Sequence, residues 1–222
     1  MDLSQRLAAF ERADLYVVIT ESFCAGRTSL EVLARVLDAG VGIVQLREKD
    51  LGGRDLYELA LAYRQRTAAA GALLIIDDRL DIAMATGADG VHLGQADLPV
   101  AAARRVAPNL VIGVSSHSLH EALAAQNEGA GYVNIGPIFP TATKPHAVSL
   151  GPAALSRIAP HLKIPWSTMG GINQGNIAQV VAKGARHPAV MSAVTAAPDV
   201  TAAARALREA IISQRSGAAK NS

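Results

Sequence analysis

The stretch LLIIDDRLDIAMATGADGVHLG, residues 73–94, decides the fold. It begins with the apolar run LLIID (73–77) and ends with a second short run, GVHLG (90–94). Between the two runs lies a helical stretch whose exit, TGADGV, contains a glycine. Neither run alternates strictly between apolar and polar residues, which is typical of parallel strands that are buried on both faces. The stretch therefore predicts a strand–helix–strand unit.

The same unit repeats along the chain. Helical stretches or equivalent connections separate short apolar runs of the same character. The predicted strands are 15–20, 42–47, 73–77, 90–94, 110–115, 132–136, 165–170 and 189–194. Eight strands at about 28 residues per unit predict an α/β protein with the (β/α)8 TIM barrel fold. A doubly wound open sheet is the main alternative, but the chain lacks a glycine fingerprint after the first strand.

Composition narrows the class of protein. Half of the 222 residues are apolar, 18% are charged, and no shift in composition marks a second domain. We expect a single barrel domain over 1–222, with a short N-terminal extension (about 1–13) and a frayed C-terminal tail (about 214–222).

Charge and hydropathy exclude several partners. A net charge of +2 is too small to indicate nucleic-acid binding, and no apolar run approaches the roughly 20 residues that span a bilayer. The single cysteine, Cys24, fits a reducing compartment, and the N-terminus lacks the pattern of a signal peptide. We therefore expect a cytoplasmic protein without nucleic-acid or membrane partners.

Active sites of TIM barrels lie where the strands end, so the residues after each strand are the candidates. Gln45, Arg47 and Lys49 follow one another at a period of two and project to one face of an extended segment. An amide and two cations make a clamp for a polyphosphate. The alternative is a solvated strand exit with surface charges.

Acidic side chains follow the next two strands. Asp77 and Asp78 end the run at 73–77, and Asp97 follows the run at 90–94. Two carboxylates on adjacent strand ends, Asp78 and Asp97, are how Mg²⁺ is usually held. The alternative for each is a helix N-cap, because each precedes a helical stretch.

The fifth strand end offers Ser115 and His117, and a further histidine, His92, lies within the fourth strand. Ser115 stands at the predicted mouth of the barrel, where a cap or turn is as reasonable as a ligand contact. We interpret His92 as packed in its strand and His117 as structural, since His117 has no obvious acid partner.

The sixth strand leads into GPIFPTATKP, residues 136–145. The connection is long for this fold and its prolines stiffen it, which favours a functional loop that folds over a ligand. Thr141 and Thr143 offer hydroxyl groups two residues apart, and Lys144 adds a mobile cation.

The last two strands supply backbone groups. Gly170 and Gly171 let backbone N–H groups approach a ligand, and Met191 and Ser192 can add further donors. A phosphate site built from the loops after strands 7 and 8 recurs in this fold. With the metal site above, the mouth would hold a diphosphate and a monophosphate, which suggests transfer of a group from a diphosphate leaving group.

These residues resemble those of the thiamine phosphate synthase family. The matching segments are YVVIT, VQLREK, DDRLDIA, ADGVHLGQADLP, IGVSSHS, NIGPIFPTATKP, MGGI and VMSAV, and they cover about residues 15–200. The resemblance implies a barrel that joins hydroxymethylpyrimidine diphosphate to thiazole phosphate and releases pyrophosphate. It implies a dissociative mechanism in which the aminopyrimidine stabilises a methylene cation, so that no protein nucleophile is needed.

The resemblance also implies a role for each candidate residue. Mg²⁺ would bind Asp78 and Asp97. The pyrimidine diphosphate would bind Gln45, Arg47, Lys49, Ser115 and Lys144, of which the last four are the candidate catalytic residues. The thiazole phosphate would bind Thr141, Thr143, Gly171, Met191 and Ser192, and we expect Gly170, from the same glycine pair, to belong to the substrate-binding set as well. Asp77, where the family often has asparagine, would add a charge beside the diphosphate.

Two other functions remain as alternatives. A thiazole tautomerase shares the barrel, but Pro137, Asp78, Asp97 and Lys144 favour the synthase. A non-catalytic phosphate-binding barrel is a second alternative, against which the complete set of charged positions speaks. The sequence leaves the oligomeric state open, with a homo-oligomer among the possibilities.

Overall fold

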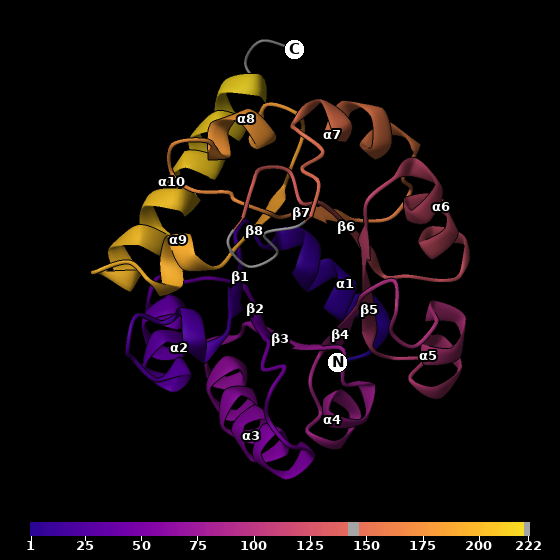
Figure 1. Ribbon diagram of the computed structural model, residues 1–222, viewed down its shortest axis with the longest axis vertical. Coiled ribbons are helices and arrows are strands. Elements are labelled where there is room, and N and C mark those ends of the chain that lie inside the picture. The colour runs from indigo at the N-terminus through magenta and orange to yellow at the C-terminus, as the bar shows by residue number, and fades with distance from the viewer. Residues whose placement is uncertain (142–146, 220–222) are drawn as a thin grey trace.

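The chain forms a closed barrel of parallel strands. The computed structural model describes residues 1–141 and 147–219, and within them the strands pair in chain order from β1 to β8, with β8 closing on β1 (Figure 1). The strands are β1 (Tyr16–Ile19), β2 (Ile43–Leu46), β3 (Leu73–Asp77), β4 (Gly90–Leu93), β5 (Val111–Ser116), β6 (Tyr132–Ile135), β7 (Trp166–Thr168) and β8 (His187–Val190). The single-domain TIM barrel predicted from the sequence is confirmed.

Helices α2 to α10 surround the barrel, and α1 lies across it (Figure 1). They are α1 (Leu3–Arg12), α2 (Ser29–Asp38), α3 (Gly53–Ala70), α4 (Leu80–Ala85), α5 (Val100–Val106), α6 (Leu119–Asn127), α7 (Ala153–Ile158), α8 (Ile177–Val181), α9 (Ser192–Thr195) and α10 (Val200–Ala219), with the 3₁₀ turns η1 (Glu21–Phe23) and η2 (Ala159–His161). Helix α10 includes the first residues of the predicted tail. Across the described residues, no helix combines the length and apolar character needed to cross a membrane.

Both faces of each strand are buried, which explains the continuous apolar runs. In β1, Val17 and Ile19 belong to the outer core between barrel and helices, whereas Tyr16 and Val18 belong to the core inside the barrel. Burying one such aliphatic side chain stabilises the fold by roughly 1.5–3 kcal/mol. The alternation predicted by strand geometry is therefore present, but it separates two apolar environments instead of core and solvent.

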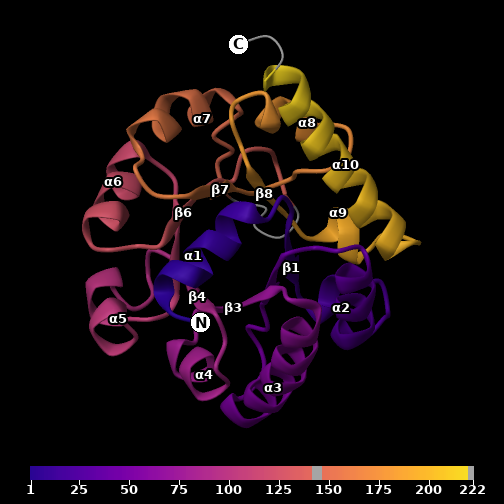
Figure 2. The same ribbon diagram turned by 180° about the vertical axis from the view of Figure 1, so that it is seen from behind.

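Helix α1 closes the bottom of the barrel, and Figure 2 shows it across the open end of the strands. A capping box between Asp2 and Gln5 begins the helix. Its buried residue Phe10 stacks on Tyr132 of β6, with the ring centroids 4.5 Å apart. The predicted N-terminal extension is therefore a helix that packs against the inner core.

The last strand differs from its prediction. The sequence indicated a strand at 189–194, but β8 spans His187–Val190 and helix α9 begins at Ser192. An apolar run of this length fits a strand or a short buried helix equally well, so its periodicity could not decide. The shift matters because it places Met191 and Ser192 beyond the strand end, at the mouth of the barrel.

Candidate functional site

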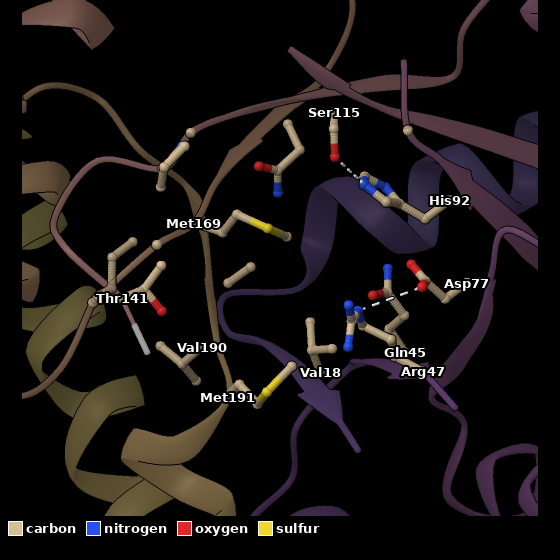
Figure 3. Close-up of a pocket in the computed structure, with 18 of the residues that line it drawn as sticks. Val18, Gln45, Arg47, Asp77, His92, Ser115, Thr141, Met169, Val190 and Met191 are labelled. Carbon is tan, nitrogen blue, oxygen red and sulfur yellow. Dashed lines mark hydrogen bonds and ion pairs between the residues drawn. The ribbon is translucent and has the colours of Figure 1, made fainter. Parts of the chain in front are cut away.

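A cavity of about 780 Å³ opens at the carboxyl ends of the strands (Figure 3). Every predicted site residue within the described part of the chain lines it: Gln45, Arg47, Lys49, Asp77, Asp78, Asp97, Ser115, Thr141, Gly170, Gly171, Met191 and Ser192. Thr143 and Lys144 lie outside the described residues. The structure thus brings the described candidates together, while the role of each one stays a prediction.

Two cations from the β2 exit share one carboxylate. Arg47 Nε lies 3.5 Å and Lys49 Nζ 3.2 Å from the same oxygen, Oδ2 of Asp77. The backbone of Arg47 is held at the end of β1, because its N–H donates to Ile19 O at 2.9 Å and its carbonyl accepts a 2.7 Å hydrogen bond from the hydroxyl of Thr20, the residue after β1. The predicted clamp is therefore built on a rigid strand end, with its charge partly balanced by Asp77.

The second carboxylate, Asp78, lies in a strained turn. Its φ of 58° is in the left-handed region, which non-glycine residues rarely adopt, and its N–H donates to the His92 carbonyl at 2.8 Å. Its side chain forms an ion pair with Lys49. Burial raises the pKa of Asp78 despite this ion pair, and the nearby carboxylates of Asp77 and Asp97 raise it further.

Neither Asp78 nor Asp97 caps a helix, so the N-cap interpretation is wrong for both. Arg79 precedes α4 and Pro99 precedes α5, without a capping side-chain hydrogen bond in either case. Instead, Asp97 closes the turn after β4 by accepting a 2.7 Å hydrogen bond from the N–H of Gly94. The turn holds the Asp97 carboxylate near Asp78 in the cavity lining.

The donor set of this corner fits Mg²⁺. Within 1–141 and 147–219, no group of three or more histidine, cysteine or acidic side chains is arranged to hold a metal ion. Mg²⁺, however, is typically held by one or two carboxylates, and substrate phosphates and water complete its octahedral shell. Asp78 and Asp97 supply such a pair of carboxylates in the cavity lining.

Ser115 is held from two sides. Its Oγ lies 2.9 Å from His92 Nε2, and its carbonyl accepts a 2.6 Å hydrogen bond from Gln95. His92 is buried, as predicted, but it also lines the cavity, which the sequence interpretation missed. His117 does have an acid partner, contrary to the prediction, because its Nδ1 and its N–H both contact the Glu121 carboxylate of α6.

The loop after β7 relies on glycine geometry. Gly170 and Gly171 have φ values of 102° and 63°. A Cβ on Gly171 would lie 2.8 Å from Phe139 Cβ and closer still to the Pro140 carbonyl oxygen. Because no side chain intervenes, the segment after β6 runs directly against this loop, and Phe139 N–H donates to Gly170 O at 3.0 Å.

Residues that lie inside the predicted strands complete the wall of the cavity. Val18, Met169 and Val190 form an apolar lining between the charged corner and the glycine loop (Figure 3). Asn134, in the middle of β6, donates to Ser167 Oγ at 2.7 Å and also lines the cavity. Sequence reasoning missed these residues because it looked beyond the strand ends, although an amide within the apolar run YVNIG was a usable signal.

The fold and the site together define the class of protein: a TIM-barrel enzyme whose cavity combines clustered charges with a glycine-lined loop suited to small anionic molecules. A family model described as thiamine monophosphate synthase matches residues 15–194. The chain belongs to this family.

Individual relatives agree with the family assignment. The chain is 49% identical to a thiamine-phosphate synthase from Chloroflexus aurantiacus, over 87% of this chain and 90% of the relative. It is 48% identical to one from Methanoculleus marisnigri, over 89% and 95%. A solved structure of a thiamine phosphate pyrophosphorylase from Pyrococcus furiosus superposes with a TM-score of 0.86 at 38% identity, covering 92% of this chain and 98% of that one.

Proposed function

We propose that the protein is a thiamine phosphate synthase that moves the 4-amino-2-methylpyrimidin-5-ylmethyl group from its diphosphate to the nitrogen of 4-methyl-5-(2-phosphoethyl)thiazole. The methylene C–O bond breaks and pyrophosphate leaves with the electron pair, after which the thiazole nitrogen lone pair forms the new C–N bond. The observation that carries this proposal is one cavity lined by both a cation–carboxylate cluster and a glycine-lined loop. The family assignment supports the same reaction.

The β2–β4 side of the cavity would bind the leaving group. Asp78 and Asp97 would hold Mg²⁺, which neutralises the charge that develops on departing phosphate oxygens. Lys49 now contacts both Asp77 and Asp78, so a cation bound by Asp78 would release Lys49 toward the diphosphate. Arg47 offers a planar, permanently charged partner beside it.

The β6–β8 side would position the acceptor. Gly170, Gly171, Met191 and Ser192 line the cavity across from the charged corner and would bind the thiazole phosphate. Thr141, in the loop after β6, lines the same region (Figure 3). Close placement of two bound reactants lowers the barrier without a protein nucleophile. The apolar wall formed by Val18 and Met169 would help to exclude water from the methylene cation of the pyrimidine.

Several parts of the proposal remain predictions. Lys144 would meet the diphosphate and Thr143 would contact the thiazole phosphate, and both lie outside the described residues. The Mg²⁺ requirement, the cytoplasmic location and a homo-oligomeric state also stay predictions. The tautomerase alternative is not favoured, because Pro137 lies in the cavity lining and the described charged positions of the synthase set are present there.

An assay with both purified substrates and Mg²⁺ tests the proposal. We expect thiamine phosphate and pyrophosphate to form in equal amounts, and we expect EDTA to stop turnover and added Mg²⁺ to restore it. Omitting either substrate is the control for hydrolysis. Absence of thiamine phosphate would overturn the proposal, and conversion of a thiazole carboxylate tautomer without pyrimidine diphosphate would indicate the isomerase instead.

A further inference from the structure

A continuous chain of hydrogen bonds crosses the interior of the barrel beneath the cavity. Gln45 Nε2 lies 2.7 Å from the Tyr16 hydroxyl, which lies 2.9 Å from the Tyr132 hydroxyl. The Tyr132 hydroxyl lies 2.9 Å from His92 Nδ1, and His92 Nε2 lies 2.9 Å from Ser115 Oγ. Figure 3 shows the His92–Ser115 end of the chain and Gln45 on the same cavity wall. The chain thus joins two candidate substrate ligands from β2 and β5 through three buried side chains.

Donor and acceptor chemistry gives this chain a direction. In the orientation of the Gln45 amide, Nε2 can only donate, so the Tyr16 hydroxyl accepts from it. Tyr16 then donates to Tyr132, and Tyr132 donates to His92 Nδ1. His92 is left with its proton on Nε2 and donates that proton to Ser115 Oγ. Ser115, which lines the cavity, therefore keeps its own hydroxyl proton for another acceptor, and the carbonyl oxygen of Gln45, also in the cavity lining, is left to accept.

The barrel is shaped to hold this chain. β5 carries Gly113 where a Cβ would overlap the Tyr132 ring and hydroxyl, so the missing side chain lets that ring cross the interior. Phe10 stacks on one side of the Tyr132 ring, and His92 packs against it with ring centroids 5.7 Å apart. Burial raises the pKa of Tyr16 and of Tyr132, so both hydroxyl groups keep their protons at neutral pH. These contacts fix the geometry from three strands and from α1.

We propose that Tyr16, Tyr132 and His92 form a positioning relay that holds Gln45 as a hydrogen-bond acceptor and Ser115 as a hydrogen-bond donor toward the substrate. An aminopyrimidine carries an amino donor, and its diphosphate carries acceptor oxygens, so the pair would match that substrate from both ends. The matching of the substrate rests on the proposed function, whereas the direction of the chain does not. Tyr16 and Tyr132 lie outside the cavity lining and act through their neighbours, whereas His92 belongs to the lining and acts on Ser115 through its Nε2.

The direction of the chain is tested without substrate. Nitrogen-15 NMR of the labelled protein reports which imidazole nitrogen carries the proton. We expect His92 to be neutral with the proton on Nε2, and a proton resident on Nδ1 would overturn the direction. This measurement gives the direction of the hydrogen-bond chain even if the protein makes no thiamine phosphate. Its outcome is therefore separable from that of the proposed function.

Coupling to the ligands is tested by a double-mutant cycle on kcat/KM for the pyrimidine diphosphate. Tyr132→Phe keeps the ring but removes the hydroxyl that links Tyr16 to His92. We expect about a tenfold loss in the otherwise unchanged protein, the effect of one buried hydrogen bond, and less than a twofold further loss in the Ser115→Ala background. Equal losses in both backgrounds, or no loss in either, would overturn the relay.

Two further variants separate positioning from folding. Tyr63→Phe is the matched control, because Tyr63 is equally buried and its hydroxyl donates to Ser29 O at 3.2 Å in the outer helical layer. We expect it to change thermal stability without changing kcat/KM. Where Tyr132→Phe does not fold, Tyr16→Phe tests the chain from its other end in a Gln45→Ala background, and additive losses there would equally overturn the relay.

Discussion

Strand β4 has a carboxylate beyond each of its ends, and the two carboxylates have opposite surroundings. Asp89, at the bottom, is fully buried; its Oδ2 lies 2.6 Å from Arg64 Nη1 and accepts the Leu74 N–H at 3.0 Å, and its Oδ1 lies 3.4 Å from Arg6 Nε. Asp97, at the mouth, accepts the Gly94 N–H and has another carboxylate as its neighbour. Asp89 is paired with arginines at the bottom, where the pairing serves stability, whereas Asp97 lies beside another carboxylate at the mouth, where the candidate site lies.

The largest effect is expected from Asp89→Ala. The substitution leaves two arginines without their buried partner, and breaking such a pair costs about 3–5 kcal/mol of the free energy of unfolding. We expect denaturant unfolding to show this loss, while kcat of the protein that remains folded stays within a few-fold of its original value.

The control for this variant is Asp81→Ala. Asp81 also pairs with an arginine, Arg79, but both side chains are exposed, so the substitution should cost less than about 1 kcal/mol. A loss at Asp89 as small as that at Asp81 would contradict the assignment of the bottom carboxylate to stability.

Asp97→Ala is the counterpart at the mouth. Removing one of two proposed Mg²⁺ ligands should lower kcat roughly 100- to 1,000-fold, the usual cost of losing one electrostatic contact to a transition state. Removing Asp97 relieves the crowding of another carboxylate but also removes the hydrogen bond to the Gly94 N–H, so the two effects should offset and the midpoint of thermal unfolding should change little. Steady-state kinetics and a thermal melt check both points, and undiminished turnover would remove Asp97 from the site.

The free energy of unfolding should depend on pH through His187, which lies at the bottom of the barrel. Burial, together with the positive charge of Arg215, lowers the pKa of His187 to about 4, whereas the unfolded chain binds this proton near pH 6.5. The unfolded state thus holds more protons between these values, so stability should fall by up to roughly 3 kcal/mol as pH drops from about 6.5 to about 4.

Denaturant unfolding at several pH values checks this dependence, with His187→Gln as the reference. The glutamine can still donate to the Ala13 carbonyl that His187 Nδ1 contacts, but it does not titrate. The mouth acts in the opposite sense, because the raised pKa of Asp77 and of Asp78 adds stability as pH falls. Equal pH dependence of the two proteins in this window would contradict the assignment.

The strands of the barrel and its bottom differ in how far the sequence alone predicts them. Parallel strands buried on both faces leave short apolar runs, and glycine helix exits separate them, so the barrel could be predicted from 73–94 and its repeats. The closure of the bottom could not be predicted in this way, because Phe10 of α1 contacts Tyr132, which lies more than one hundred positions away in sequence. Likewise, nothing local in the sequence pairs Asp89 with Arg6.

The residues at the mouth were easier to predict, because the strand topology alone brings them together. All eight strands are parallel, so residues just beyond them meet at one end whatever their separation in sequence. The contacts inside the barrel could not be predicted from the sequence. Tyr16 and Tyr132 look like ordinary core residues there, and their hydroxyl groups meet only once the barrel closes. The pairing of Asp77 with two cations could not be predicted for the same reason, because Arg47 and Lys49 come from the neighbouring strand end.

That pairing gives the smallest expected effect, in Asp77→Asn. The substitution removes one negative charge beside Arg47 and Lys49 but keeps a side chain of the same shape. One unit charge at contact distance in water is worth about 1 kcal/mol, so pyrophosphate with Mg²⁺ should bind at least about three- to fivefold more tightly. Calorimetric titration measures this, with Asp81→Asn as an exposed control. Weaker binding would mean that Asp77 holds the two cations in place more than it neutralises them, and the mouth would then resemble the bottom of the barrel in its use of charge.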